Sequence, residues 1–460
     1  MYASTDSLFY GNSIDKILQK EYYEWYKLTK KYPDYTFPKL SRTTNNAFLI
    51  NRSCCDTLQS LPVVCTDAQW CFDGTGTVTF HNDYGVRLYL VPEDGGKNKN
   101  KNNAKIKAPK ILVPFYRWFK PHSIITGVIH PKLSLYVDSE NNNTHTNKLV
   151  ILSHKNLPLQ LHKINYCEEE RITSLFNYST ENPTNEKYET VYSLSFISDF
   201  QFLSGSVKDK IALYDLNYKD PIVTWKPNNH NISKSTIVTC FSDYDDYHIK
   251  EQRMNNAVLF GDNKNRIYRI DLRSKQNNNQ STDLVYSDAL NHGNGISQIL
   301  SSANGHYQYI LKRKSNKIDV LDLRGGINVN YVINSFQISP NEPCMGKSYK
   351  VRGCINNKYG LLIGSNYRKV IYNNWNHDFI EFGGIDRDGN VHSYTEDNLE
   401  TIINYHENVS EGDVMTNIVK SNPIDPDQLF ISYTPRICSN SADDINNVVP
   451  CKSGLGYFNI

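Results

Sequence analysis

The residues with the clearest potential for intermolecular chemistry are six lysines between positions 97 and 110, without an acid among them. They are Lys97, Lys99, Lys101, Lys105, Lys107 and Lys110, and Arg117 and Trp118 follow closely. A flexible basic loop can neutralise phosphates, with salt-sensitive affinity and little sequence selectivity. We therefore select Lys105, Lys107, Lys110, Arg117 and Trp118 as predicted partner or RNA contacts. The interleaved asparagines favour the alternative, a solvated insertion without a partner.

A second basic run, from Lys312 to Lys317, lies on a predicted turn and has the same alternative. The acids show no catalytic pattern. Asp215, Asp271 and Asp322 recur at equal positions of repeated strands, which indicates a structural role. The 13 His have no ligand spacing, and no nucleophile, metalloprotease or phosphate-loop motif is present. We expect no catalytic residue, cofactor or metal.

The elements that would position these residues are hairpins with a common pattern. A short apolar strand, a polar turn and a second strand ending in an aliphatic-Asp-Leu signature occur at Phe202–Leu216, Ala257–Arg273 and Tyr307–Arg324. Repetition at intervals of about fifty residues indicates stacked like units, of which a propeller blade is the commonest. Propellers are usually surfaces that assemble partners.

The composition agrees with a globular, β-rich protein. Of 460 residues, 39% are hydrophobic, the net charge is +2, and 32 Tyr and 18 Phe accompany only 4 Met. No apolar run is long enough to span a membrane, and the first residues lack the features of a secretory signal. The ten Cys are scattered without zinc-ligand spacing, which indicates reduced thiols in the cytosol or nucleus.

We predict an all-β fold of two parts. Residues 1–45 contain a helix at 13–32 and an extended linker, and residues 46–460 form a seven-bladed propeller with Asn/Lys-rich loop insertions. The last strand, 456–460, would be the third of its blade and would leave an unpaired edge. A strand at 47–51 is available to pair there, which would close the ring.

Two blades are harder to trace. In the second, we place Trp118 and Phe119 on the first strand, 133–137 on the second and 148–152 on the third. In the sixth, both 359–365 and 379–394 could supply the second strand, and we prefer the latter because of its Asp-Gly turn. In the first, Asp73-Gly74 should form the tight turn after the first strand.

With the blades in place, the chain resembles WD-repeat proteins. Within them it resembles the branch that contains the metazoan telomerase Cajal-body protein and a fungal splicing-associated factor linked genetically to the cap trimethylguanosine synthase. The resemblance extends over about 65–325. It rests on Ala68-Gln-Trp-Cys-Phe-Asp-Gly with Val86-Arg-Leu-Tyr-Leu-Val-Pro, on Ser193-Leu-Ser-Phe with Leu203-Ser-Gly, and on His292-Gly-Asn-Gly-Ile-Ser running to Val320-Leu-Asp-Leu-Arg324.

The resemblance assigns structural roles to several residues. His292 occupies the position of the blade histidine, Asp209 that of the turn aspartate, and Tyr89, Tyr214 and Tyr268 that of the usual tryptophan. No blade has the complete set, and the Gly-His pair is missing. By resemblance, the function is a non-catalytic nuclear scaffold in pre-mRNA splicing that helps the first small nuclear ribonucleoprotein hold the 5′ splice site.

Two alternatives remain open. One is a WD-repeat protein that binds a small RNA directly during ribonucleoprotein biogenesis or trafficking. The other is a hydrolytic or glycan-active propeller, which a secretion signal or channel carboxylates would favour. For partners we expect spliceosomal ribonucleoprotein components, with snRNA as a candidate contact and no membrane. The chain itself would be a monomer within a larger complex.

Overall fold

The computed structural model describes twenty segments of the chain. They are residues 34–35, 63–91, 93–94, 114–134, 148–164, 172–182, 185–225, 236–243, 257–273, 282–288, 294–302, 305–315, 317–325, 332–337, 351–356, 360–364, 370–373, 379–381, 414–435 and 454–459. Within these residues the chain is nearly all β, and its helical structure is one 3-10 turn, η3 (Leu323–Gly325). The predicted helix at 13–32 and strand at 47–51 lie outside the described residues.

The first sheet has four antiparallel strands in sequence order. They are β2 (Cys65–Trp70), β3 (Gly76–His81), β4 (Gly85–Leu90) and β6 (Tyr116–Phe119). In the turn between β2 and β3, Gly74 has φ of 68°, a conformation that glycine adopts without steric cost. The Asp73 carboxylate accepts a hydrogen bond from the Thr75 amide at 3.1 Å. The predicted Asp73-Gly74 turn is confirmed.

The second and third sheets repeat this order. The second contains β7 (Ile124–Ile129), β8 (Leu149–His154), β9 (Leu159–Ile164) and β10 (Ile172–Tyr178). The third contains β13 (Ser193–Phe196), β14 (Gln201–Gly205), β15 (Ile211–Asp215) and β16 (Val223–Trp225). All neighbouring pairs in both sheets are antiparallel.

The fourth and fifth sheets are joined at their first strands. The fourth contains β17 (Val238–Asp243), β18 (Ala257–Asp262), β19 (Arg266–Asp271) and β20 (Asp283–Ser287). The fifth contains β21 (Ile296–Ser301), β22 (Tyr307–Lys312), β23 (Lys317–Asp322) and β24 (Val332–Gln337). A short parallel pairing, Ser242↔Ile299 and Asp243↔Leu300, links β17 to β21 and makes one eight-stranded sheet.

The remaining sheets come from the C-terminal third. One contains β25 (Cys354–Asn356), β26 (Gly360–Gly364), β27 (Val370–Asn373) and β28 (Phe379–Glu381). The last contains β29 (Val414–Ser421), β30 (Gln428–Pro435) and β31 (Gly454–Asn459). Two small ribbons complete the strands: β1 (Asp34–Tyr35) pairs with β5 (Glu93–Asp94), and β11 (Glu181–Asn182) with β12 (Lys187–Tyr188).

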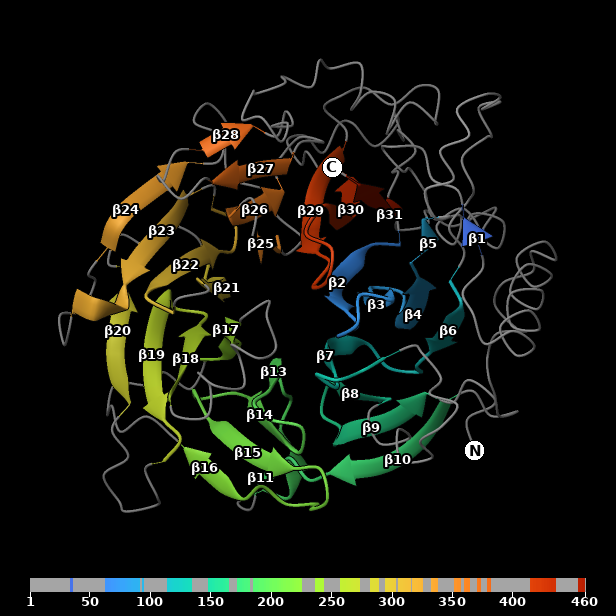
Figure 1. Ribbon diagram of the computed structural model, residues 1–460. Helices are drawn as coiled ribbons and strands as arrows, with labels where there is room; N and C mark the ends of the chain where they lie inside the picture. The colour runs from blue at the N-terminus through green and yellow to red at the C-terminus, as the bar shows by residue number, and fades with distance from the viewer. Residues whose placement is uncertain are drawn as a thin grey trace, which may run out of the picture.

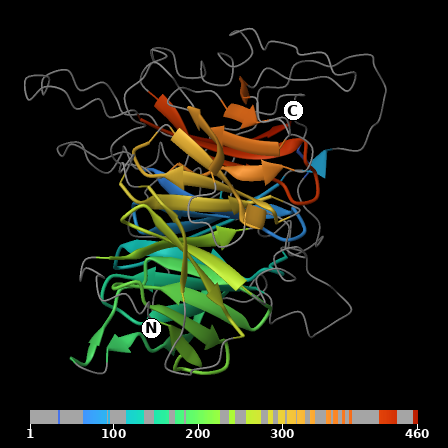
Figure 2. The same cartoon turned by 90° about the vertical axis from the view of Figure 1, so that its left-hand side faces the viewer.

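The sheets stand side by side around a common centre, with the first strand of each nearest the centre and the last at the rim. Figure 1 shows this arrangement face-on, and Figure 2 shows the successive sheets from the side. Radially placed antiparallel sheets of this kind are the architecture of a β-propeller. The chain continues outward through each sheet and then returns to the centre for the next.

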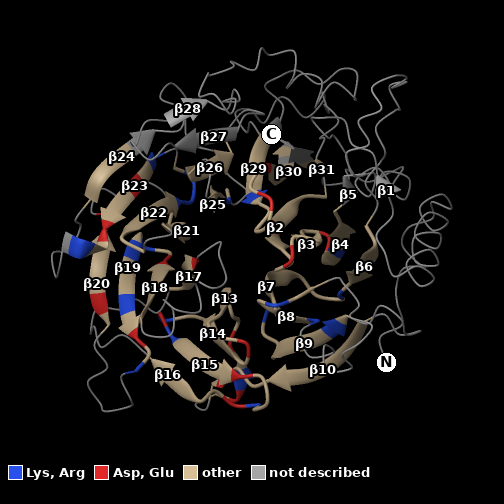
Figure 3. Ribbon diagram, viewed as in Figure 1, with Lys and Arg blue, Asp and Glu red and all other residues tan. Residues whose placement is uncertain are grey.

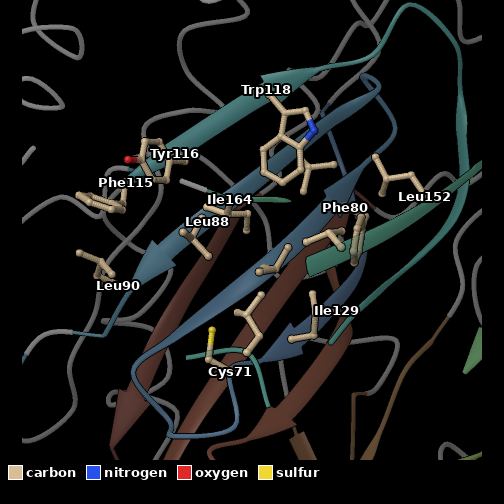
Figure 4. Packing of buried hydrophobic residues seen from close by; sticks show 14 residues of the cluster. Cys71, Phe80, Leu88, Leu90, Phe115, Tyr116, Trp118, Ile129, Leu152 and Ile164 are labelled. Carbon is tan, nitrogen blue, oxygen red and sulfur yellow. The ribbon is translucent and has the colours of Figure 1, made fainter. Parts of the chain in front are cut away.

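The hydrophobic core lies between the sheets. Val78 and Leu88 of the first sheet pack with Ile129, Leu152 and Ile164 of the second (Figure 4). Because each sheet has a neighbour on both faces, a central strand buries both of its alternating sets of side chains. The strands β3, β4 and β8 are accordingly buried along their whole length.

The last sheet packs against the first. Ile418, Phe430 and Leu455 share a buried cluster with Cys65 and Tyr89, although about 350 residues separate these two parts of the chain. The strand β31 is third in its sheet, as the sequence predicted, and among the described strands none pairs with its outer edge.

The three signature hairpins are confirmed as β14–β15, β18–β19 and β22–β23. The prediction for the second sheet was wrong by one strand. Trp118 lies on β6, the outer strand of the first sheet, and residues 149–154 form the second strand instead of the third. A long stretch of sequence separates β4 from β6, so no short turn marks these two strands as neighbours.

The preferred second strand of the sixth sheet was also wrong. The segment at 359–365 supplies it as β26, and Phe379–Glu381 is the fourth strand, β28. The apolar run Leu361–Ile363 is fully buried, which is the property of an inner strand. The Asp-Gly sequence on which the prediction relied lies outside the described residues.

Candidate functional site

A cavity of about 500 Å³ occupies the centre of the ring. Its walls come from the first strands β2, β7, β13, β17 and β29, with Gln298 of β21 and Ile355 of β25. Every sheet thus contributes to one hollow, because the innermost strands converge there (Figure 1). Clefts of this size with mixed polar and apolar walls are the usual place for a ligand or a partner segment.

Two glutamines tie neighbouring sheets together along this wall. The Gln69 amide donates to Gly127 O at 2.9 Å and accepts from Ile129 N at 2.9 Å. The Gln298 amide makes the same pair of bonds with Gly353, at 3.1 and 2.9 Å. Each glutamine therefore satisfies backbone groups that face the cavity, which fixes the spacing of the inner strands. Neither glutamine was predicted from the sequence, because a single Gln is not part of a motif with recognisable spacing.

The charges on the cavity wall are balanced. Arg352 Nε lies 3.8 Å from the Asp67 carboxylate, and Arg352 Nη1 donates to Ser297 O at 2.9 Å. Lys420 and Asp243 add one further charge of each sign. The hydroxyl of Thr239 donates to the Ile296 carbonyl at 2.6 Å and so links the fourth and fifth sheets. These polar groups hold the ring together, and the cavity offers mixed contacts to a bound segment.

Asp209 lies in a buried charge network between the third and fourth sheets. Its side chain is 0% exposed, and Arg266 Nη2 bridges it to Asp262 at 3.5 and 2.5 Å. Burial, together with the nearby Asp262 carboxylate, raises the pKa of Asp209 to about 6, although Arg266 acts to lower it. This aspartate joins two turns of adjacent sheets.

Asp215, Asp271 and Asp322 end the third strands of three consecutive sheets and make the same local contact. Each carboxylate accepts a hydrogen bond from the amide two residues later, at 2.9 Å in all three cases. Such a side-chain turn closes the strand and points the chain toward the fourth strand. Tyr214 and Tyr268 precede two of these aspartates and are buried among the sheets.

Of the five predicted contact residues, the structure describes Arg117 and Trp118. Arg117 and Trp118 lie on β6 with exposures of 4% and 9%. The indole packs with Phe80 and Leu152 between the first and second sheets (Figure 4), so its place is in the core and not on a surface. Lys105, Lys107, Lys110 and His292 lie outside the described residues.

Of the second basic run, Lys312 is buried and paired with Asp288 and Asp319. Among the described residues, no group of three or more His, Cys, Asp or Glu side chains is placed to hold a metal. The described helix content includes no span that could cross a bilayer. Cys65, Cys71, Cys240 and Cys354 are buried and unbridged.

The chain is similar along nearly its whole length to fungal proteins named SWT21. It is 32% identical to Protein SWT21 of Vanderwaltozyma polyspora over 99% of this chain and 96% of that protein. It is 33% identical to the Kluyveromyces lactis protein over 94% and 93%, and 30% identical to the Eremothecium gossypii protein over 98% of each. No family model matches the chain.

Proposed function

Because the chain belongs to the SWT21 family, we propose that it is a non-catalytic scaffold in nuclear pre-mRNA splicing. The observation that carries this proposal is the similarity to SWT21 proteins over at least 94% of the chain. The resemblance of residues 65–325 to the splicing-associated branch of WD-repeat proteins supports it. In this role the protein associates with the spliceosome and helps the first small nuclear ribonucleoprotein hold the 5′ splice site.

The architecture supports a scaffold. We take the six four-stranded units and the three-stranded unit β29–β31 as the blades of a seven-bladed propeller of the WD-repeat type. The outer edge of β31, with which no described strand pairs, is the place where the predicted strand at 47–51 would pair. A rigid ring of this kind presents turns on two faces and a central cavity, which suits simultaneous contacts with several partners. The protein would act as a monomer within a larger complex, without a cofactor.

Affinity purification from nuclear extract tests the proposal. The tagged full chain should bring down spliceosomal proteins and snRNA, and it should do so more strongly than a tagged, unrelated propeller of similar size. Depletion of the protein should lower the occupancy of 5′ splice sites by the first small nuclear ribonucleoprotein. Purification without splicing components, together with unchanged splicing after depletion, would contradict the proposed function.

A further inference from the structure

In four consecutive sheets, the turn between the second and third strands carries a cation at its tip. Lys155 follows β8, Lys208 follows β14, Lys264 follows β18, and Arg313 and Lys314 follow β22. The first four of these side chains are exposed, and Lys314 is half-buried. We call these five residues the basic turn row. The basic run at 312–317 contains part of this row, but its continuation in the preceding sheets cannot be recognised in the sequence.

Backbone contacts bring the turns of the third and fourth sheets together. Ile237, just before β17, forms an antiparallel bridge with Val207 in the turn that carries Lys208. On its other side, Ile237 O accepts from Asn263 N at 3.1 Å, and Ile237 N donates to the Asn263 side chain at 3.0 Å. Asn263 is the neighbour of Lys264, so one residue separates the two basic turns.

Similar hydrogen bonds, made by a residue just before the first strand of the next sheet, join the turns of the fourth and fifth sheets. Gly295, just before β21, donates its amide hydrogen to the Asn265 side chain at 2.7 Å and accepts from Arg313 N at 2.8 Å. In the second sheet, Asn156 N donates to the Thr190 hydroxyl at 3.0 Å, on the segment that leads into the third sheet. The basic turn row therefore runs along one face of the ring, and contacts link its turns from the third sheet to the fifth.

The cations of the row have no carboxylate partner among the described residues. None of the five side chains makes a hydrogen bond or an ion pair there. Exposed arginines elsewhere behave differently: Arg273 and Arg324, beyond the ends of the third strands, are each held by a carboxylate at 2.8 and 2.7 Å. Figure 3 shows the charged residues on the ribbon. Cations that share one face and have no carboxylate partner among the described residues raise the local potential and attract a polyanion.

A cavity of about 620 Å³ lies beside two members of the row. Lys264 and Arg313 line it together with Tyr192, Asn263 and Asn294. Thr239 and Ser297 also line it, and because each hydroxyl donates its hydrogen to a backbone carbonyl, it can offer its oxygen as an acceptor. Amide and hydroxyl groups can read the edge of an unstacked base, and a tyrosine ring can stack on its face. An acidic peptide would use the cations but would have no need of these groups.

The equivalent turn of the first sheet presents an aromatic residue instead of a cation. Tyr84 is 42% exposed and has φ of 64°. A positive φ is unusual for a bulky residue and costs free energy. The backbone conformation of this turn therefore does not explain why its residue is a tyrosine. An exposed ring next to the start of a basic row gives a base a second stacking partner.

We propose that the basic turn row binds single-stranded RNA, with the phosphates along Lys155, Lys208, Lys264 and Arg313 and a base in the adjoining cavity. The inference deepens the proposed function and rests on it for the choice of RNA as the polyanion that the protein meets. It uses none of the lysines between 97 and 110.

The test measures binding of the purified full chain to a fluorescein-labelled, single-stranded RNA of about 20 nucleotides, a length that spans several turns. The variant Lys208→Gln/Lys264→Gln/Arg313→Gln should bind about tenfold to a hundredfold more weakly at 0.1 M salt. Its plot of log affinity against log salt should be flatter by about two, since three phosphate contacts are lost.

The matched control is Arg269→Gln/Arg273→Gln/Arg324→Gln, which removes the same charge from exposed arginines that are paired with carboxylates. It should keep the affinity and the salt slope of the unsubstituted protein. Equal losses in the two variants would show that only net charge matters and would overturn the proposal. Unchanged binding in the first variant would do the same.

Two further outcomes decide between partners. Polyglutamate of the same total charge should compete with RNA poorly; equal competition would overturn RNA as the ligand and favour an acidic protein segment. If the unsubstituted chain binds no RNA but still purifies with splicing proteins, the inference fails and the proposed function stands. If it binds RNA but brings down no splicing component, the proposed function fails instead.

Discussion

The ammonium group of Lys312 lies between two carboxylates in the interior. Its Nζ is 2.6 Å from Asp288 and 2.7 Å from Asp319, and its side chain has no solvent exposure. Burial alone would raise the pKa of Asp319, but hydrogen bonds from Lys312, Ser335 and Tyr286 outweigh it and hold that pKa at about 2. Because Asp288 follows the outer strand of the fourth sheet, the cluster joins that sheet to the fifth.

Replacing Lys312 by Met should lower the free energy of unfolding by about 3–5 kcal/mol, since two buried carboxylates lose their cation. Urea unfolding at neutral pH measures it. The triple variant Lys312→Met/Asp288→Asn/Asp319→Asn should recover much of the loss, because no charge is then buried alone. A loss below about 1 kcal/mol in the single variant would contradict the structure of this cluster.

Asp209 gives the stability a defined pH dependence. Its pKa of about 6 in the folded protein is higher than the ordinary value near 4 that we expect in the unfolded chain. Between about pH 4 and 6 the folded state therefore holds a proton that the unfolded state has lost, so the contribution of Asp209 to stability falls as the pH rises through this window.

Replacing Asp209 by Asn removes this titration. Relative to the unsubstituted protein, the variant should gain up to about 3 kcal/mol between pH 4 and pH 7, because the raised pKa corresponds to about two units. Urea unfolding of both proteins across this range measures the difference. A difference that is constant with pH, or that changes in the opposite direction, would show that the carboxyl is not protonated in this way.

At the scale of the strands, a recurring glycine lets neighbouring sheets approach. Gly205, Gly261 and Gly364 lie at or near the ends of the second strands β14, β18 and β26. A Cβ added at Gly261 would meet Ile296 Cβ of the next sheet at 2.6 Å. Added at Gly364, it would meet a backbone oxygen at 2.3 Å. The absence of a side chain thus sets the distance between sheets.

Replacing Gly261 by Ala should lower the free energy of unfolding by about 1–3 kcal/mol, because the packed interface between the fourth and fifth sheets has no room for a methyl group. Thermal unfolding measures it. The pair Gly261→Ala/Ile296→Ala removes Ile296 Cγ2, which would lie 2.7 Å from the added Cβ, so it should lose less stability than the two single variants together. If Gly261→Ala is as stable as the unsubstituted protein, the sheets do not approach as described.

Strand prediction from the sequence succeeded where short turns left little freedom. The hairpins ending at Asp215, Asp271 and Asp322 have compact polar turns, and their register follows from the alternation of apolar residues. It failed at β6, because the chain between Leu90 and Tyr116 is long and local pattern does not say which sheet an isolated strand joins. It also failed at β26, where the buried apolar run was the better signal.

The site was less accessible to sequence reasoning than the fold. The sequence shows Lys208, Lys264 and Arg313 as ordinary turn residues about fifty positions apart. Only the bridges through Ile237 and Gly295 make them neighbours on one face. Density of charge along the chain drew the prediction to the lysines between 97 and 110, which lie outside the described residues, because a linear pattern shows local clusters and not those assembled by topology.

At the scale of the whole molecule, the two faces of the ring differ in chemistry. The face with the turns between second and third strands carries the basic turn row, whose cations have no carboxylate partner in the part of the chain that the structure describes. Beyond two of the third strands, exposed arginines are paired with carboxylates, Arg273 with Asp271 and Arg324 with Asp322. A ring with cations along one face can bind a polyanion there and leave the other face and the central cavity for proteins.

Both proposals require that the ring is closed by contact between the last and first sheets. The Tyr457 hydroxyl lies 2.6 Å from the Thr77 hydroxyl and donates to Tyr89 O at 3.2 Å, so it spans the closure. The variant Tyr457→Phe should lose about 1–2 kcal/mol, because buried polar groups of the first sheet lose their partner.

Hydrogen exchange tests the closure most directly. In the unsubstituted protein the slowest amides of β3 (Gly76–His81) and β30 (Gln428–Pro435) should open with the same free energy, as parts of one cooperative unit. In Tyr457→Phe both should become less protected by the same amount. If protection falls in β30 while β3 keeps its original value, the two ends of the chain do not close the ring.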